Sequence, residues 1–363
     1  MNKKIRVLQI VDSLGRGGGV INVVLNWHRN IDKNKIQFDY LYTLKLKDSL
    51  KKEIENLGGK VYCLDYRGVF HLCSFLKNIY KFFRNHRYNT IHSHITHLNL
   101  FFYPLAKIFG TKNIIQHAHG IRWSDKKLNG WRNYLMLHTV WFLITKKLAC
   151  SEKSGQFWFG KNFTLINNGI DLDKFDYKSF IRENKRKELG LENNFVLGHV
   201  GRLSNEKNHR FFIDVFENLI ILDPSARLIL VGTGPLEKQI KHYAEGKGLQ
   251  DKILFLGMQE NVNEMYQVFD VFCLPSLHEG MPIVAIEAQC SGLPCLFSDA
   301  ITKEVLIIPN TRMLSLTTPT KIWAEQIFAL KGNKRWSGVQ YLKNYGFDIK
   351  DNVRQIEEIY GAR

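Results

Sequence analysis

Short apolar segments alternate with stretches of helical periodicity along most of the 363-residue chain, and no other feature limits its fold as strongly. The first seven apolar segments predict strands at residues 5–11, 38–42, 60–64, 90–92, 113–116, 147–149 and 163–166. Between most of them, as in 72–83 and 96–109, apolar residues recur every three to four positions, which is typical of amphipathic helices. This βαβα order predicts a parallel sheet with helices on both faces.

The alternation stops at residues 167–194, which are polar and charged, and it resumes beyond them. The interruption predicts an interdomain linker with a short helix near 182–189. The second series predicts strands at 196–200, 227–231, 253–256, 271–274 and 294–297, and helices at 208–222, 236–247, 283–291, 321–331 and 352–360. The expected fold class is therefore α/β, with two doubly wound domains, residues 1–175 and 176–345, facing a central cleft.

The sequence predicts a cytoplasmic protein without a transmembrane helix. The apolar run near its start ends at Asp12, which makes it shorter than the core of a signal peptide. The longest apolar stretch, 134–145, is about half as long as a bilayer span. The six cysteines form no CxxC pair, which favours reduced core residues over a metal or redox site.

The net charge of +17 lies entirely in the first half of the chain. Residues 1–180 carry 29 Lys and Arg against 12 Asp and Glu, whereas residues 181–363 carry 22 of each kind. Such a field attracts an anionic partner, and the sequence has no zinc-finger spacing or aromatic RNA-binding motif to favour nucleic acid. Basic and aromatic residues mingle in 77–89 and 122–147. Such segments either lie on an anionic membrane surface or pack as helices on a sheet.

Two glycine-rich turns follow predicted strands and are placed to hold an anion. Residues 15–19 read GRGGG, so backbone amides could approach a phosphate there, or the segment is only a tight turn. Val20 stands where a dinucleotide-binding fingerprint requires glycine, which argues against a nicotinamide enzyme. Residues 201–208 read GRLSNEKN, in which Arg202 and Lys207 are spaced to grip a diphosphate.

The sharpest motif is HEGMPIVAIEA at residues 278–288. A loop carrying Glu279 follows a predicted strand, and Pro282 favours a helix start, so Glu287 lies about one and a half turns into an apolar helix. A buried carboxylate needs hydrogen-bond partners, which either sugar hydroxyls or a nearby Lys or Arg could supply. The amides of residues 280–284 could hold phosphate oxygens.

Histidines follow two predicted strands, His92, His94 and His97 after one and His117 and His119 after the next. Their spacing matches no metal-binding motif, so they predict polar groups that face a substrate cleft, with His119 as the strongest candidate. The pair Asp171 and Asp173 has the D-x-D pattern of some divalent-ion sites, but it falls in the predicted linker, and no metal is expected there.

Together these motifs resemble glycosyltransferase family 4, whose members have the GT-B fold of two Rossmann-like domains. The resemblance is carried by RGGG, QHAHG, ACSEKSG, NNGIDLDKF, HVGRLSNEKNH, LILVGTGPLEKQI, FLGMQENV and HEGMPIVAIEAQCSGLPCLFSD, which span nearly the whole chain in order. The segment CSGLPCLFSDAITKEV is most similar to the subgroup that builds bacterial capsules and exopolysaccharides. The resemblance implies that a helix in 346–363 packs back on the N-terminal, acceptor-binding domain.

The resemblance also implies a function: a retaining, metal-independent transferase that moves a sugar from a nucleotide-diphosphate sugar, with UDP-sugars favoured and no cofactor. The acceptor would be a glycan or a polyprenyl-diphosphate-linked sugar in capsule, exopolysaccharide or O-antigen synthesis, and the basic segments would hold the enzyme at the inner face of the cell membrane.

The site residues follow from the same resemblance. Glu279 would contact donor hydroxyls, Glu287 would hold the ribose, and Arg202 and Lys207 would neutralise the leaving diphosphate near His119. The implied catalytic set is His119, Arg202, Lys207 and Glu279, and the implied donor-binding set is Gly17, Gly18, Gly257, Met258, Gly280, Met281, Pro282, Ile283, Val284 and Glu287.

One residue and one short segment depart from the family's pattern. Val20 replaces the usual acidic residue of the first loop, and residues 300–304 read AITKE in place of a glycine-rich G-x-P-E stretch. The alternatives left open are an epimerase or hydrolase of the same fold and a non-catalytic partner protein. The intact Arg202, Lys207, Glu279 and Glu287 favour an enzyme.

Overall fold

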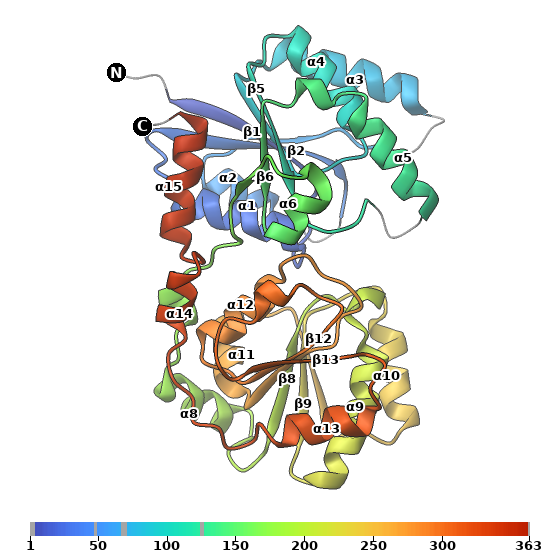
Figure 1. The fold of residues 1–363 in the computed structure, drawn as a ribbon, viewed down its shortest axis with the longest axis vertical. Helices are drawn as coiled ribbons and strands as arrows, with labels where there is room; N and C mark the ends of the chain where they lie inside the picture. The colour runs from blue at the N-terminus through green and yellow to red at the C-terminus, as the bar shows by residue number, and fades with distance from the viewer. Residues whose placement is uncertain (1–3, 47–48, 67–70, 124–126, 362–363) are drawn as a thin grey trace. The chain divides into compact units, whose positions relative to one another are not determined.

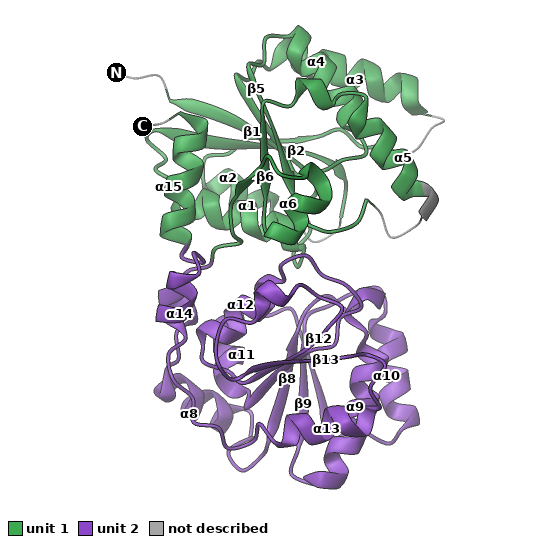
Figure 2. Ribbon diagram, in the orientation of Figure 1, with its two compact units in different colours: residues 1–169, 349–363 green, residues 170–348 purple. Residues whose placement is uncertain are grey.

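The computed structural model describes residues 4–46, 49–66, 71–123 and 127–361. The chain divides into two compact units, Met1–Gly169 with Ile349–Arg363 and Ile170–Asp348 (Figures 1 and 2). The boundaries expected at 175 and 345 lie within a few residues of these divisions. Each unit is built on its own parallel sheet, as the βαβα order predicts.

The first unit has a seven-stranded sheet in the order β3-β2-β1-β4-β5-β6-β7. Its strands are β1 (Ile5–Ser13), β2 (Ile36–Leu44), β3 (Val61–Cys63), β4 (Thr90–Ser93), β5 (Asn113–Ala118), β6 (Lys146–Ala149) and β7 (Thr164–Leu165). The strand order reverses beside β1, which is the topological switch point of a doubly wound sheet. The loops after β1, β4 and β5 therefore lie along one edge, at and next to the switch point.

The helices of the first unit lie around this sheet. They are α1 (Gly19–Asn30), α2 (Lys51–Asn56), α3 (Leu72–Asn85), α4 (Asn99–Ile108), α5 (Lys127–His138), α6 (Glu152–Phe159) and α15 (Ile349–Tyr360), with a 3₁₀ turn at Trp141–Leu143. Most of them bury an apolar face, as α1, α3 and α4 do. Helix α15 lies beside α1 and buries Ile356 and Tyr360, so the end of the chain completes the first unit (Figure 1).

The second unit has a six-stranded sheet in the order β10-β9-β8-β11-β12-β13, so its switch point lies between β8 and β11. The strands are β8 (Val196–Val200), β9 (Arg227–Val231), β10 (Ile253–Gly257), β11 (Val271–Leu274), β12 (Cys295–Ser298) and β13 (Thr311–Leu314). The helices are α7 (Leu172–Phe175), α8 (Ser179–Glu188), α9 (His209–Leu222), α10 (Glu237–Gly246), α11 (Val262–Val268), α12 (Ile283–Cys290), α13 (Thr320–Phe328) and α14 (Val339–Asn344). Two 3₁₀ turns, Asn205–Lys207 and Lys303–Val305, complete it.

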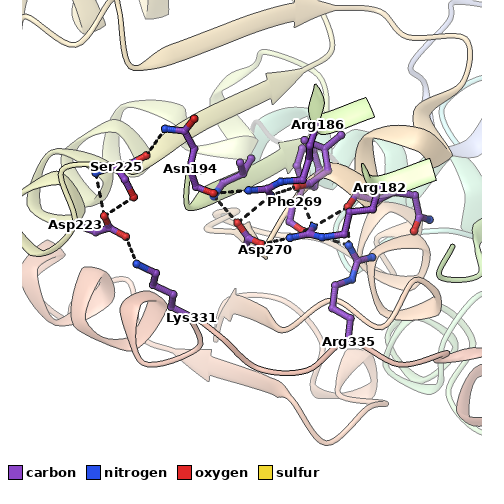
Figure 3. Close-up of polar contacts among 12 residues, drawn as sticks. Arg182, Arg186, Asn194, Asp223, Ser225, Phe269, Asp270, Lys331 and Arg335 are labelled. Carbon is purple, nitrogen blue, oxygen red and sulfur yellow. Dashed lines mark hydrogen bonds and ion pairs between the residues drawn. The ribbon is translucent and has the colours of Figure 1, made fainter. Parts of the chain in front are cut away.

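The division between the units falls within the segment 167–194, predicted as a linker, and the short helix expected near 182–189 is α8. From Ile170 onward, however, the segment is a packed part of the second unit rather than a free linker. Arg182 and Arg186 of α8 form ion pairs with Asp270 and donate to carbonyl groups at the end of α11 (Figure 3). Arg335 donates to the Gln267 carbonyl of the same helix end at 2.8 Å. Cations at a helix C-terminus offset its partial negative charge, so the polar sequence of α8 serves to anchor α11.

No helix among the described residues combines the length and the apolar character needed to cross a bilayer. Within these residues all six cysteines are free thiols, and Cys150, Cys273, Cys290 and Cys295 are buried as predicted. The prediction of a core position is wrong for Cys73, which is exposed, and Cys63 is only partly buried.

Candidate functional site

The loops that follow β8, β9 and β11 are tied together along the carboxyl edge of the second sheet. Leu203 N–H donates to the Thr233 carbonyl at 3.0 Å, and Leu277 N–H donates to the Glu206 carbonyl at 2.8 Å. Gly232 adopts a φ of 127°, and a Cβ there would lie 2.1 Å from the carbonyl oxygen of Gly201. The glycine turn at 232–234 is thus required for the two loops to approach each other.

Lys207 and Glu279 meet at this edge. Lys207 ends the 3₁₀ turn after β8, and its Nζ lies 2.5 Å from Glu279 Oε1, with both side chains mostly shielded from solvent. Asn208, which follows Lys207, has a φ of 57° and caps α9. A left-handed residue turns the chain sharply, so it ends the loop and starts the helix at one position. The structure therefore brings together two of the four predicted catalytic residues.

Arg202 belongs to the same loop as Lys207 but has a different environment. Its side chain is exposed, and within the described part of the chain its guanidinium forms no hydrogen bond or ion pair. In the same loop the Glu206 carboxylate is held in place, because Ser204 Oγ donates a hydrogen bond to Glu206 Oε1 at 2.6 Å. Despite its partial burial, this hydroxyl contact and the cations Lys207 and Arg202 lower the pKa of Glu206, so its carboxylate stays charged.

Glu287 has a partner that the sequence did not indicate. It lies in α12, and its Oε2 accepts a hydrogen bond from the Tyr266 hydroxyl of α11 at 2.7 Å. Burial raises the pKa of Glu287 to about 7, although the Tyr266 hydrogen bond and the Lys174 charge oppose that shift. The predicted alternative of a nearby Lys or Arg is only partly right, because a neutral hydroxyl makes the direct contact. A carboxyl group with a pKa this high holds or releases a proton near neutral pH.

The remaining donor-binding candidates of the second unit lie at strand and helix ends. Gly257 ends β10 with a φ of 63° and accepts a hydrogen bond from Gly232 N–H, and the exposed Met258 follows it. Gly280, Met281 and Pro282 lead into α12. The helix begins with Ile283 and Val284, whose amides lack partners within the helix because they belong to its first turn.

In the first unit, the glycine loop after β1 forms the start of α1. Gly17 has a φ of 81°, which favours glycine, and Gly18 is the N-cap residue. The Gly18 amide is already used, since it donates to the Gly15 carbonyl at 3.3 Å. A phosphate at this loop would therefore meet the first-turn amides of α1, among them those of Gly19 and Val20.

The strand-end histidines form one buried network rather than a row of groups facing solvent. His94 Nδ1 lies 2.8 Å from His119 Nε2, and His92 Nε2 lies 3.2 Å from His117 Nδ1. Trp27 stacks on His92 and His117 with interplanar angles of 17° and 23°. The prediction that these side chains face a substrate cleft is wrong for His92, His94 and His117, which are buried, whereas His119 at the end of β5 is partly exposed.

Burial lowers the pKa of each of these four histidines, and that of His119 falls to about 3. All four rings are therefore neutral at physiological pH. Ligand nitrogens of His92, His94 and His117 lie within 4.8 Å of one another. Such a spacing could suit a metal, but hydrogen bonds among the histidines and Tyr360 already occupy several of these nitrogens.

The D-x-D pair has a structural role in part. Asp171 is the N-cap residue of α7, and its Oδ1 accepts a hydrogen bond from Lys174 N–H at 3.1 Å. Such a contact is a standard way to satisfy a free amide at a helix start. Of the basic and aromatic segment 122–147, residues 124–126 lie outside the described part of the chain, and most of the remainder forms α5.

Sequence reasoning missed Tyr266, Gln9 and Tyr360, which contact the candidate residues. Tyr266 is uncharged and lies in a short helix without a recognisable motif. Gln9 lies within the apolar run of β1, and its polar character there was the signal that could have drawn attention to it. Tyr360 is distant in sequence and reaches the histidines only through the packing of α15.

Comparison with known proteins gives consistent results. The model of the family described as "Glycosyl transferases group 1" matches residues 181–323. The putative glycosyltransferase EpsF of Bacillus subtilis is 33% identical over 371 aligned residues, which cover 98% of this chain and 96% of EpsF. An Escherichia coli protein named UDP-Gal:alpha-D-GlcNAc-diphosphoundecaprenol alpha-1,3-galactosyltransferase is 30% identical, covering 62% of this chain and 61% of its own length. Other relatives are named for capsular polysaccharide and lipopolysaccharide core biosynthesis.

Among solved structures, HepE of Anabaena in complex with UDP-glucose has a TM-score of 0.81 and 18% sequence identity, covering 99% of this chain and 100% of HepE. At this identity the likeness concerns the fold, which is the two-unit α/β architecture expected from the sequence.

Proposed function

Because this chain belongs to glycosyltransferase family 4, the group 1 glycosyl transferases, we propose that it moves a sugar from a UDP-sugar to a lipid-linked glycan. The E. coli relative, whose name specifies UDP-Gal and a diphosphoundecaprenol-linked acceptor, supports this choice of donor and acceptor. In the transfer, the bond between the anomeric carbon and the diphosphate breaks, and an acceptor oxygen takes its place with retained configuration. The product belongs to a capsule, an exopolysaccharide or an O-antigen.

The observation that carries the proposal is the Lys207–Glu279 pair at the carboxyl edge of the second sheet. The leaving diphosphate gains negative charge as the sugar departs. Lys207 and the first amides of α12 are fixed positive groups that stabilise this charge without a metal or a cofactor, and the exposed Arg202 adds a second cation from the same loop. In this proposal Glu279, which lies next to Lys207, accepts hydrogen bonds from the donor sugar while Lys207 contacts the phosphates.

The other residues bind the nucleotide. Glu287 accepts hydrogen bonds from the ribose hydroxyls, and Gly257 and Met258 lie against the base. Gly280, Met281, Pro282, Ile283 and Val284 form the turn and helix start that hold the phosphates, and Gly17 and Gly18 shape the first-unit loop. The proposal also gives His119, which is partly exposed after β5 of the first unit, a contact with substrate.

We expect a UDP-sugar to stabilise the protein and to be consumed only when an acceptor is present. A ligand at 100 times its dissociation constant adds about 2.7 kcal/mol of stability, so thermal melting with UDP-, GDP- and ADP-sugars identifies the donor. Transfer to a synthetic lipid-diphosphate sugar is then measured in excess EDTA, and NMR assigns the new anomeric linkage. Product formation without acceptor would indicate an epimerase or hydrolase, and inverted linkage or loss of activity in EDTA would contradict the proposed chemistry.

The first unit also supports binding to an anionic membrane surface, which would place the enzyme at the inner face of the cell membrane. Its aromatic side chains Trp131 and Phe142 are 69% and 81% exposed. A shallow pocket beside α5 is lined by Ile121, Arg122, Trp123, Gly130, Trp131, Tyr134 and Phe157. Arginine beside exposed aromatic rings suits an interface of phosphate headgroups and acyl chains.

In liposome co-sedimentation, Trp131→Ala together with Phe142→Ala should lower binding to anionic vesicles at least about fivefold, because each ring loses apolar burial. Phe180→Ala is the matched control, since Phe180 is an equally exposed ring (72%) in the second unit. Binding should also fall with salt. Equal, salt-insensitive partitioning onto neutral and anionic vesicles would contradict membrane docking.

A further inference from the structure

In the histidine network of the first unit, the orientation of the Gln9 side-chain amide determines which atoms donate hydrogen bonds and which accept them. Gln9 Nε2 donates to the Tyr360 hydroxyl at 3.0 Å, and Gln9 Oε1 lies 3.0 Å from His94 Nε2. An amide oxygen can only accept, so His94 Nε2 carries a proton. The His94 ring is neutral because burial lowers its pKa well below the ordinary value, which leaves His94 Nδ1 as an acceptor.

The acceptor state of His94 Nδ1 determines which nitrogen of His119 carries the proton. His94 Nδ1 accepts a hydrogen bond, so the proton between it and His119, 2.8 Å away, lies on His119 Nε2. A neutral imidazole has one proton, so His119 Nδ1 keeps a free electron pair. His119 Nδ1 is itself buried, and within the described residues it has no hydrogen-bond partner, so its lone pair is left without a donor.

The same reasoning applies to a second branch of the network, which runs from Tyr360 through His92 to His117. The first branch is the one from Gln9 through His94 to His119. Because the Tyr360 oxygen accepts from Gln9, its own proton is free to reach His92 Nδ1 at 2.6 Å. His92 Nε2 then donates to His117 Nδ1 at 3.2 Å. Rotating the Gln9 amide by 180° would reverse every donor and acceptor in both branches. The Gln9 amide, held between His94 and Tyr360 of α15, therefore decides which atoms donate and which accept throughout the network.

We propose that Gln9, His94 and Tyr360 are positioning residues that hold His119 as the Nε2–H tautomer, so that its Nδ1 accepts a hydrogen bond from a substrate hydroxyl. The part concerning substrate rests on the proposed function. His119 Nδ1 can accept a hydrogen bond from a substrate hydroxyl only while its lone pair points at that hydroxyl. In the reversed tautomer Nδ1 would carry a proton, so it would donate a hydrogen bond instead of accepting one. Tyr360 acts on this contact through two intervening side chains.

The tautomer can be measured directly by NMR of the protein labelled with ¹⁵N-histidine, with His119 assigned by comparison with His119→Gln. The wild type should show a protonated Nε2 and an unprotonated Nδ1 at His119. Tyr360→Phe removes the group that orients the Gln9 amide, so His119 should populate both tautomers. Gln9→Leu should do the same, whereas Gln9→Glu keeps an acceptor facing His94 and should restore the single tautomer.

Turnover should follow the tautomer. Tyr360→Phe and Gln9→Leu should each lower kcat at least about threefold, with the donor KM unchanged within about twofold, on the scale of one misplaced hydrogen bond. Gln9→Glu should recover most of kcat. Tyr103→Phe is the matched control, because it removes another buried hydroxyl of this unit, 2.5 Å from Gln116 Oε1, and Gln116 points to the opposite face of β5 from His117.

A wild-type His119 protonated on Nδ1 would overturn the proposal, as would unchanged tautomers or unchanged kcat in both Tyr360→Phe and Gln9→Leu. A drop in kcat equal to that of Tyr103→Phe would reduce Tyr360 to a packing role and would also overturn it. The NMR measurement requires no turnover. If the protein lacked transferase activity but showed the expected tautomers, the proposed function alone would fail.

Discussion

Lys207→Ala should lower the kcat of sugar transfer at least about 100-fold, the scale of losing one preorganised contact to the transition state. Lys207 is held 2.5 Å from Glu279, so its ammonium group is fixed before substrate arrives, and its charge opposes that of the departing diphosphate. Glu279→Ala should have an effect of similar size, because it removes the carboxylate that orients Lys207 and contacts the sugar. Steady-state kinetics with saturating donor and acceptor measures both.

Two further variants sharpen this test. Because the two side chains act as one unit, the double variant should be no more than about threefold worse than the poorer single variant. Lys331→Ala is a matched control: Lys331 also pairs with a carboxylate, Asp223, at 2.7 Å, but Asp223 precedes β9 at the opposite edge of the sheet. Near-wild-type turnover in both Lys207→Ala and Glu279→Ala would overturn the assigned site.

Acid should unfold the first unit well above pH 4. Burial lowers the pKa of His28 from 6.5 to about 4 and that of His119 to about 3, and it lowers those of His92, His94 and His117 as well. A lowered pKa means that the unfolded chain binds protons that the folded unit does not. Stability is therefore fully present above pH 6.5 and falls as the pH drops toward these folded values.

The size of this effect is large. Each such histidine removes about 1.4 kcal/mol per pH unit within its window, so a few of them exceed the stability of an ordinary domain. The second unit has only two such histidines, His199 and His209, among the described residues with a resolved shift. Its Glu287, with a pKa raised to about 7, has the opposite sign and gains stability as the pH falls from 7 toward 4.5. We expect the first unit to unfold at a higher pH than the second, as followed by hydrogen exchange resolved to each unit.

The variant His28→Gln serves as a control for this prediction. His28→Gln removes one titrating ring outside the strand-end network, so the slope of unfolding free energy against pH should fall by about 1.4 kcal/mol per pH unit. A free energy of unfolding that stays constant between pH 6.5 and 4.5 would contradict the prediction.

The sequence predicted best what depends on local apolar pattern. The strands at 196–200, 227–231 and 271–274 match β8, β9 and β11 because continuous apolar runs are buried on both faces of a parallel sheet. Strand β13 was missed because its residues Thr311–Leu314 are only partly buried at a sheet edge and carry Arg312. Helix α8 was assigned to a linker because it packs through arginine side chains rather than through an apolar stripe.

The sequence predicted which residues form the candidate site, but it did not predict the contacts between them. Glycine turns and strand ends located Lys207 and Glu279 on loops of the same sheet edge, because parallel strands all end there. Their direct pairing depends on how the loops after β8 and β11 pack, which no spacing encodes. The hydrogen bond from Tyr266 to Glu287 and the link from Tyr360 to His92 join residues far apart in sequence, and only the tertiary structure reveals them.

The placement of α15 has a consequence for how the protein is made. The helix belongs to the first unit, yet the ribosome adds it only after the whole of the second unit has been synthesised. Until then the nascent first unit lacks the hydroxyl partner of Gln9 and His92 and the apolar face that covers α1. Residues 1–169 expressed alone would be an incomplete unit, and a chain truncated a few residues before Tyr360 would lose the hydroxyl that contacts Gln9 and His92.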